Sequence, residues 1–227
     1  MSYNLFNTRR TIMDRKAKLT IILNHIILTR GFSTLSMAQL AKLAGVSRAT
    51  LYLYFKNKGE IVSAVTKRHI DFISKQMQVN TENNVSVYQN IRLSMLLLTG
   101  SVSEIFLAEL RREYPEMAQQ LEESTDYFEK KTSQKLRELQ QNNIISEEVD
   151  IDALVLQDSA LVTASIRKAL NGEWSFEQIK TVFLNYFVST MKGTVSKDEE
   201  SQLNFEQTKA FQKRIFSELY ATFYKRI

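Results

Sequence analysis

The chain has 227 residues, of which 44% are hydrophobic and 24% are charged, and this composition is typical of a globular protein and not of a disordered one. It contains no cysteine, which excludes disulfides and thiolate metal sites and favours a reducing compartment, so we expect a cytoplasmic protein. The apolar runs are too short or too interrupted to form a signal peptide or a membrane span. We therefore expect no membrane partner.

The net charge of +5 is distributed unevenly along the chain. Residues 1–58 hold ten Lys and Arg against the single acid Asp14, a net charge of +9, which leaves −4 for the remainder. Solvated charged faces usually mix both signs, and this one does not. The imbalance predicts that the N-terminal part meets a polyanion and that the rest of the chain has another task.

Helix is the expected structure throughout the chain. One proline and six glycines leave few strong breakers, and alternation with a period of two residues is nearly absent, so the sequence predicts an all-α fold. The first helix is expected from about Thr11 or Asp14 to Arg30, with Gly31 ending it. Its apolar residues recur at spacings of three and four: Leu19, Ile22, Leu23, Ile26 and Ile27.

Two short helices follow, joined by a tight turn. Ser36 and Gln39 have the spacing of a capping box, which starts a helix, and Gly45 suits the left-handed conformation that ends it. Ser47 then caps a second short helix, and a longer fourth helix is expected to start near Asn57. These elements are typical of a helix-turn-helix, in which the second helix lies in the major groove of DNA.

The second short helix is expected to have a core side and an outer side. Leu51 and Phe55 lie four residues apart and should face the core. We expect DNA to contact the outer side, which carries Arg48, Ala49, Tyr52 and Leu53.

Residues 34–62, TLSMAQLAKLAGVSRATLYLYFKNKGEIV, resemble the amino-terminal DNA-binding segment of the TetR family of transcriptional regulators. The resemblance covers about the first quarter of the chain. It implies an all-α protein with an N-terminal three-helix helix-turn-helix DNA-binding domain in residues 1–58. A larger helical domain for ligand binding and dimerisation, residues 59–227, is expected to follow, with the fourth helix connecting the two from about residue 58.

The resemblance also implies a set of DNA-binding residues. It places Arg48, Ala49 and Thr50 at the leading end of the recognition helix, followed by Tyr52. An arginine there can form a bidentate pair with guanine, a contact worth ~1–3 kcal/mol of base discrimination. Hydroxyl groups, and Lys58 in the first turn of the fourth helix, are expected to bind phosphates. The expected set is Ser36, Gln39, Ser47, Arg48, Ala49, Thr50, Tyr52, Leu53 and Lys58.

Some of these positions have two interpretations. Gln39 either reaches a base edge or serves only as the capping partner of Ser36. Leu53 either contacts a thymine methyl group or packs against the first helix. Ala49 stands where glycine is frequent in the family, so DNA shape is expected to add to specificity.

A basic pair precedes the expected first helix. Arg9 and Arg10 are predicted to lie in a loose arm, which either enters a minor groove or attracts phosphates without regard to sequence.

Two consecutive helices, predicted in residues 151–170 and 175–193, carry wide apolar faces. They resemble the pair that forms a four-helix dimer interface in the family; the alternative is that they build the core of one chain. We expect a homodimer, because a recognition helix usually needs a two-fold partner to reach two half-sites. A polar linker at residues 193–202 leads to an additional terminal helix at residues 203–227, which either covers a pocket or extends the dimer interface.

The candidate ligand-binding residues are Phe106, Tyr127 and Asp158. Asp158 falls in the apolar sector of its helix, where a carboxylate needs a partner. The partner is either an internal or cross-dimer salt bridge or a helix cap, or else a cationic or hydrogen-bonding effector. The two aromatic residues are candidates for the wall of a cavity, although aromatic residues at helical spacing more often belong to a core.

Other functions have less support in the sequence. His25 and His69 have no serine, acid or metal-ligand companion, and phosphate loops and nucleophile elbows are absent, so we expect no enzyme, no catalytic residues, no metal and no cofactor. An adaptor that regulates a protein partner without reading DNA is the alternative, favoured only by the apolar Leu53. The sequence thus predicts a ligand-responsive regulator of transcription, more often a repressor in this family, that binds double-stranded DNA as a dimer at an inverted repeat.

Overall fold

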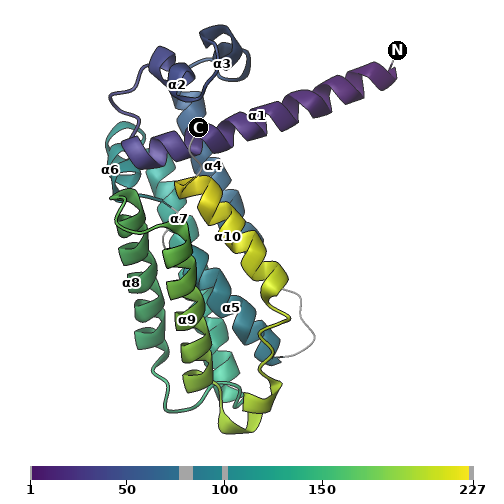
Figure 1. The fold of residues 1–227 in the computed structure, drawn as a ribbon, viewed down its shortest axis with the longest axis vertical. Coiled ribbons are helices and arrows are strands. Elements are labelled where there is room, and N and C mark those ends of the chain that lie inside the picture. The colour runs from purple at the N-terminus through teal and green to yellow at the C-terminus, as the bar shows by residue number, and fades with distance from the viewer. Residues whose placement is uncertain (1, 77–83, 99–101, 225–227) are drawn as a thin grey trace. The chain divides into compact units, whose positions relative to one another are not determined.

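The structure is a computed structural model, and it describes residues 2–76, 84–98 and 102–224 (Figure 1). Within these ranges the chain forms helices and turns with no strand, and a single antiparallel bridge joins Ile145 to Val195. No helix in the described ranges has both the length and the apolar composition to cross a membrane. The predicted all-α fold is confirmed.

The chain divides into two compact units. The first unit comprises residues 2–69, 102–119 and 221–224 of the described chain, and the second comprises residues 70–76, 84–98 and 120–220. The predicted boundary between residues 58 and 59 falls at the start of a helix that contributes to both units. That boundary remains a prediction.

The first unit contains the N-terminal helices. They are α1 (Ser2–Arg30), α2 (Met37–Leu43), α3 (Arg48–Tyr54), the larger part of α4 (Lys58–Gln76) and α6 (Glu104–Glu113). The loose arm predicted around Arg9 and Arg10 is wrong, because both residues lie within α1. No proline or glycine occurs before Gly31, so nothing in the sequence breaks the helix at the expected start.

The second unit is a bundle of longer helices. They are α5 (Asn84–Leu98), most of α7 (Pro115–Gln141), α8 (Ile151–Leu170), α9 (Phe176–Thr194), the short 3-10 helix η1 (Lys197–Gln202) and most of α10 (Lys209–Phe223). Helices α5, α8 and α9 pack on one another (Figure 1). The expected polar linker at residues 193–202 is more ordered than predicted, because α9 continues to Thr194 and η1 follows.

The apolar faces of α8 and α9 form the core of their own unit. Buried residues on these faces are Ile151, Leu154, Val162, Ile166, Ile179, Phe183, Phe187 and Met191. These residues therefore build a core within one chain, as the alternative interpretation has it, and a dimer interface on the same two helices stays a prediction. An apolar stripe predicts burial but not the identity of the element that covers it, and here α5 packs against both helices.

Candidate nucleic-acid interface

The turn between α2 and α3 is fixed by local hydrogen bonds. Ser36 caps α2, and the capping box is complete: the Ser36 N–H donates to Gln39 Oε1 at 2.8 Å and the Gln39 N–H to Ser36 Oγ at 3.3 Å. At the other end Gly45 has φ +66°, with the N–H of Val46 bonded to the Ala41 carbonyl. This is a Schellman end, which requires a left-handed residue where the sequence has glycine.

Helix α3, the second helix of the helix-turn-helix, is oriented by a cap and by two buried side chains. Ser47 Oγ accepts a hydrogen bond from the Thr50 N–H at 3.0 Å and lies 2.8 Å from Thr50 Oγ1. On the core side Leu51 and Phe55 are fully enclosed. The predicted start of the helix and its predicted core side are confirmed.

The outer side of α3 is open to solvent. Arg48 and Ala49 are exposed in its first turn, and Tyr52 and Leu53 are 46% and 79% exposed. The alternative in which Leu53 packs against the first helix is therefore excluded. These four side chains form a surface that a nucleic acid can contact without any rearrangement of the core.

Positive charge surrounds this surface. Residues 15–56 contain no Asp or Glu, and their exposed cations are Arg15, Lys16, Lys18, Arg30, Lys42, Arg48 and Lys56. Lys16 Nζ lies 5.0 Å from the centre of the Phe55 ring, which joins a cation of α1 to the end of α3. A field of one sign attracts phosphates at long range and is weakened by salt.

Two of the expected contact residues have structural tasks as well. Gln39 Oε1 accepts from both the N–H and the Oγ of Ser36, so its carbonyl end is engaged in the cap. Lys58 Nζ donates to the carbonyl oxygens of Phe32 and Ser33, at 3.1 and 2.9 Å. DNA contact by Ser36, Gln39, Ser47, Thr50 and Lys58 stays a prediction.

Sequence reasoning missed the residues that hold the loop after α1. Glu109 of α6 accepts hydrogen bonds from the N–H groups of Phe32 and Ser33, and Arg112 donates to Ser33 Oγ at 2.6 Å. Gly31 has φ +73°, and a Cβ there would lie 2.6 Å from Glu109 Oε1. Glu109 is 77 residues from Phe32, and no local signal in the sequence pairs the two.

The two histidines have structural partners in the first unit. His69 is buried, and its Nε2 lies 2.8 Å from Asn24 Oδ1. Burial, with a smaller contribution from Arg68, lowers the pKa of His69 to about 3. The imidazole is therefore neutral near pH 7. His25 Nδ1 donates to the Thr222 carbonyl at 2.9 Å, which ties the last turn of α10 to α1.

The candidate ligand residues occupy three different surroundings. In the first unit, Phe106 packs edge-on against Phe32 with ring centres 5.9 Å apart. In the second unit, Tyr127 is 54% exposed, with Lys131 Nζ 5.8 Å from its ring centre. Ligand binding by Phe106 and Tyr127 stays a prediction.

Asp158 has the internal salt bridge that the sequence offered as one interpretation. Both its side chain and that of Arg92 in α5 are fully buried, and two bonds of 2.8 Å join the guanidinium to the carboxylate. Burial alone would lower the pKa of Arg92, but Asp158 and the Tyr88 hydroxyl outweigh it and raise that pKa. Arg92 also donates to Tyr88 and Thr190, at 3.2 and 3.1 Å. An effector role for Asp158 remains a prediction.

Comparison with known proteins identifies the N-terminal region. Residues 25–65 match the family model described as bacterial regulatory proteins, tetR family. The HTH-type transcriptional activator FasR of Mycolicibacterium smegmatis is 36% identical over 58 residues, 26% of each chain. The fatty acid metabolism regulator protein of Bacillus subtilis is 26% identical over 104 residues, which are 43% of this chain and 54% of the relative.

The matches to these two curated relatives thus span about a quarter and about half of their lengths. The fold extends the likeness further. The ketosteroid transcriptional regulator KstR2 of Mycobacterium tuberculosis aligns over 81% of this chain and 96% of its own, with a TM-score of 0.62 and 15% identity. At that identity the likeness concerns the fold alone. The helix-turn-helix thus lies in a segment that matches the tetR family of bacterial regulatory proteins, and the chain as a whole is similar in fold to a known transcriptional regulator.

Proposed function

We propose that the chain is a DNA-binding regulator that represses transcription as a homodimer on an inverted-repeat operator and responds to a small-molecule effector. One observation carries this proposal: α3 is buried on one side and presents Arg48, Tyr52 and Leu53 on the other. That outer side lies in a stretch of exposed cations without any acid. A cytoplasmic location follows from the proposed partner, double-stranded DNA.

The side chains of α3 have different proposed tasks. Arg48 in the first turn reads guanine O6 and N7 through its paired N–H groups. Leu53 packs against a thymine methyl group, since an apolar side chain that is 79% exposed gains from a partner. Tyr52 and the surrounding cations bind phosphates and fix the position of the helix in the groove.

A homodimer is proposed on the geometry of DNA recognition. One seven-residue helix contacts few base pairs, and a two-fold pair of such helices reads two half-sites about one helical turn apart. The buried residues of α8 and α9 are occupied within the chain, so we propose that the dimer uses the exposed and partly exposed residues of these helices. Leu156 of α8, which is 69% exposed, marks one such surface.

The second unit supports an effector role through polar atoms left without partners. Gln89 in α5 is fully buried, and neither atom of its amide has a hydrogen-bond partner within the described residues. The buried hydroxyl groups of Ser94 and Ser165 also have no hydrogen-bond partner within the described residues. An unpaired buried polar group is costly, and a bound molecule with polar groups would remove that cost.

Selection of bound duplexes from a random pool tests the DNA-binding proposal. The unmutated protein should enrich an inverted repeat, Arg48→Ala should not, and Arg137→Ala, which removes an exposed arginine of the second unit, should enrich the same repeat. Enrichment of no sequence by the unmutated protein would contradict the proposal and favour the adaptor. A reporter gene behind the selected repeat then tests repression, which an increase in expression on adding the protein would contradict.

The effector proposal has a separate test. Since the Bacillus subtilis relative is named for fatty acid metabolism, we propose genes and metabolites of lipid metabolism as the first to screen. A molecule that releases the selected repeat should lose this effect in Gln89→Leu, while affinity for the repeat without effector stays unchanged. An unaltered response in Gln89→Leu would exclude this part of the core as the effector site.

A further inference from the structure

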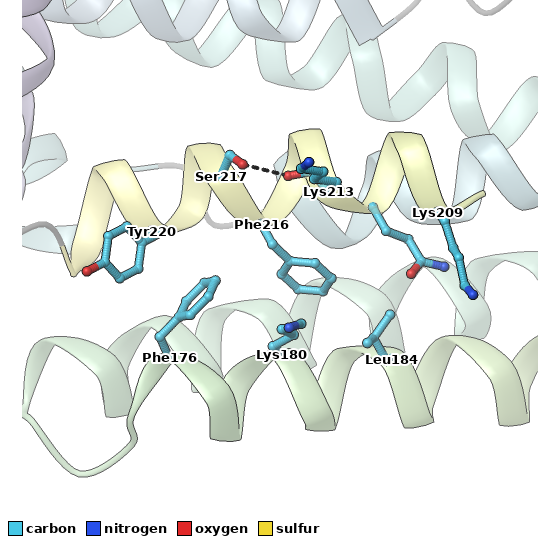
Figure 2. Close-up of a pocket in the computed structure, with 9 residues that line it drawn as sticks. Phe176, Lys180, Leu184, Lys209, Lys213, Phe216, Ser217 and Tyr220 are labelled. Atoms are coloured by element: carbon cyan, nitrogen blue, oxygen red, sulfur yellow. Dashed lines mark hydrogen bonds between the residues drawn. The ribbon is translucent and has the colours of Figure 1, made fainter. Parts of the chain in front are cut away.

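The second unit contains a groove that none of the proposed DNA or effector contacts uses. It lies between α9 and α10 and has a volume of about 430 Å³ (Figure 2). We call it the α9/α10 groove. Its apolar lining comes from Phe176, Leu184 and Phe216, and its cationic lining from Lys180, Lys209 and Lys213. No Asp or Glu lines it.

Aromatic contacts between the two helices shape the groove. Phe216 extends from α10 toward α9, above Lys180 and Leu184, and its ring centre lies 6.3 Å from that of Phe176 (Figure 2). Tyr220 meets Phe176 edge-on at 5.0 Å and closes one end. Phe216 itself is 7% exposed, so the apolar part of the groove is continuous with the core and has a fixed shape.

The lysines are available to an anion. Lys180 pairs with Glu177 at 3.4 Å and Lys209 with Glu206 at 2.6 Å, but every member of these pairs is at least 40% exposed. Exposed pairs contribute little and exchange readily. No carboxylate in the described part of the chain pairs with Lys213, and its side chain is exposed.

We propose that the α9/α10 groove binds a small anionic amphiphile: an acyl chain that ends in a carboxylate or a phosphate. The chain would bury apolar surface against the two phenylalanines and Leu184, and the anionic end would accept hydrogen bonds from the lysines. The volume falls within the range of ~300–1,000 Å³ that is usual for small-molecule sites. This site is separate from the DNA-binding surface, and the binding experiment does not depend on that function.

A second copy of the chain fits the groove less well. A two-fold interface brings the same patch of each copy together. The lysine-lined wall of one copy would then face that of the other, and Lys213 would meet another lysine, so like charges would repel. An amphiphilic anion pairs with the lysines and fills the apolar part of the lining at once.

Titration calorimetry with four probes of equal chain length tests the proposal: dodecanoate, dodecyl phosphate, dodecanol and dodecyltrimethylammonium, each below its micelle concentration. We expect the two anions to bind one per chain, the alcohol at least tenfold more weakly, and the cation not at all. The difference between the two anions identifies which head group the lysines prefer.

Variants locate the binding. Lys180→Gln combined with Lys213→Gln should weaken the anions about tenfold, since two partly exposed ion pairs are lost, and the corresponding double change to arginine should retain them. Lys192→Gln removes an exposed lysine of α9 outside the groove, and the affinity for both anions should stay unchanged. Leu184→Asn should reduce the affinity for the anions, because it replaces an apolar side chain of the groove with a polar one.

Three results would each overturn the proposal. The first is equal affinity for dodecanol and dodecanoate. The second is unchanged affinity in the double glutamine variant, whose fold is checked by circular dichroism. The third is a change of molecular mass in gel filtration with Lys213→Glu, which would identify the groove as an interface between copies.

Discussion

Polar side chains are exposed on the helix-turn-helix but buried in the core of the second unit. Around α3 they lie in solvent, and the hydrogen bonds that fix the backbone join residues three to five apart, such as Ser47 with Thr50. In the second unit the charged pair of Arg92 and Asp158 is fully buried and 66 residues apart in the chain. Surface chemistry can therefore vary on α3 with little effect on folding, whereas a single change in the core affects the whole unit.

The largest expected effect comes from breaking the buried pair. Asp158→Ala leaves the Arg92 guanidinium buried without its partner, and we expect a loss of about 3–5 kcal/mol in the free energy of unfolding, measured by urea denaturation. The exposed pair of Arg137 and Asp152 is the matched control. Arg137→Ala should lower the free energy of unfolding by less than about 1 kcal/mol. Equal losses would show that burial does not distinguish the two pairs.

Acid should destabilise the first unit through His69. The unfolded imidazole takes up a proton near pH 6.5 and the buried one only near pH 3, so protons favour the unfolded chain between these values. We expect stability to fall by about 1.4 kcal/mol for each pH unit below 6.5, until the pH approaches the folded pKa.

His69→Gln removes the titrating group and keeps a side chain that can donate to Asn24. Urea denaturation across this pH range should then show a shallower loss of stability in the variant than in the unmutated protein. Identical slopes would mean that His69 is not the group responsible.

Gly31 and Gly172 offer a matched pair of changes to alanine. Both have positive φ, but a Cβ at Gly31 meets the Glu109 carboxylate, whereas one at Gly172 meets nothing within 4 Å. Gly172→Ala should lower the free energy of unfolding by about 1–2 kcal/mol, because the left-handed backbone conformation is unfavourable for alanine. Gly31→Ala should lower it by about 1–3 kcal/mol more, because the hydrogen bonds to Glu109 are also lost. Thermal unfolding measures both variants. Equal shifts in melting temperature would contradict the close packing of Gly31 against the Glu109 carboxylate.

The smallest expected effect on stability is at the outer side of α3. Arg48→Ala and Leu53→Ala remove exposed side chains, so each should change the free energy of unfolding by less than about 0.5 kcal/mol. Urea denaturation provides the measurement. A loss above about 1 kcal/mol would mean that these side chains support the fold, and it would remove the clean separation between folding and recognition.

The same contrast explains what the sequence could predict. The caps at Ser36 and Ser47, and the glycine stop at Gly45, follow from residues close together in the chain, and the structure contains all of them. The core side of α3 likewise follows from one helical period. The fold class and the orientation of the candidate DNA-binding surface were therefore predictable.

Features that depend on residues far apart in the chain could not be predicted from the sequence. The burial of Asp158 was predictable from its helix, but its partner Arg92 lies on another helix and has no local signature. For the same reason the apolar stripes of α8 and α9 could not reveal that α5 packs against both helices. The start of α1 was missed because the expected helix rested on apolar periodicity, which a polar helical segment need not have.

Fluorescence anisotropy of Arg48→Ala on the selected repeat and on a random duplex, at one salt concentration, tests the central claim most directly. If α3 reads bases, the variant should lose about tenfold to a hundredfold in affinity per half-site on the repeat, as expected for a bidentate arginine–guanine pair worth ~1–3 kcal/mol. Its affinity for the random duplex should change little. Equal losses on both duplexes would mean that Arg48 binds only phosphates, and would contradict the role of α3 in reading sequence.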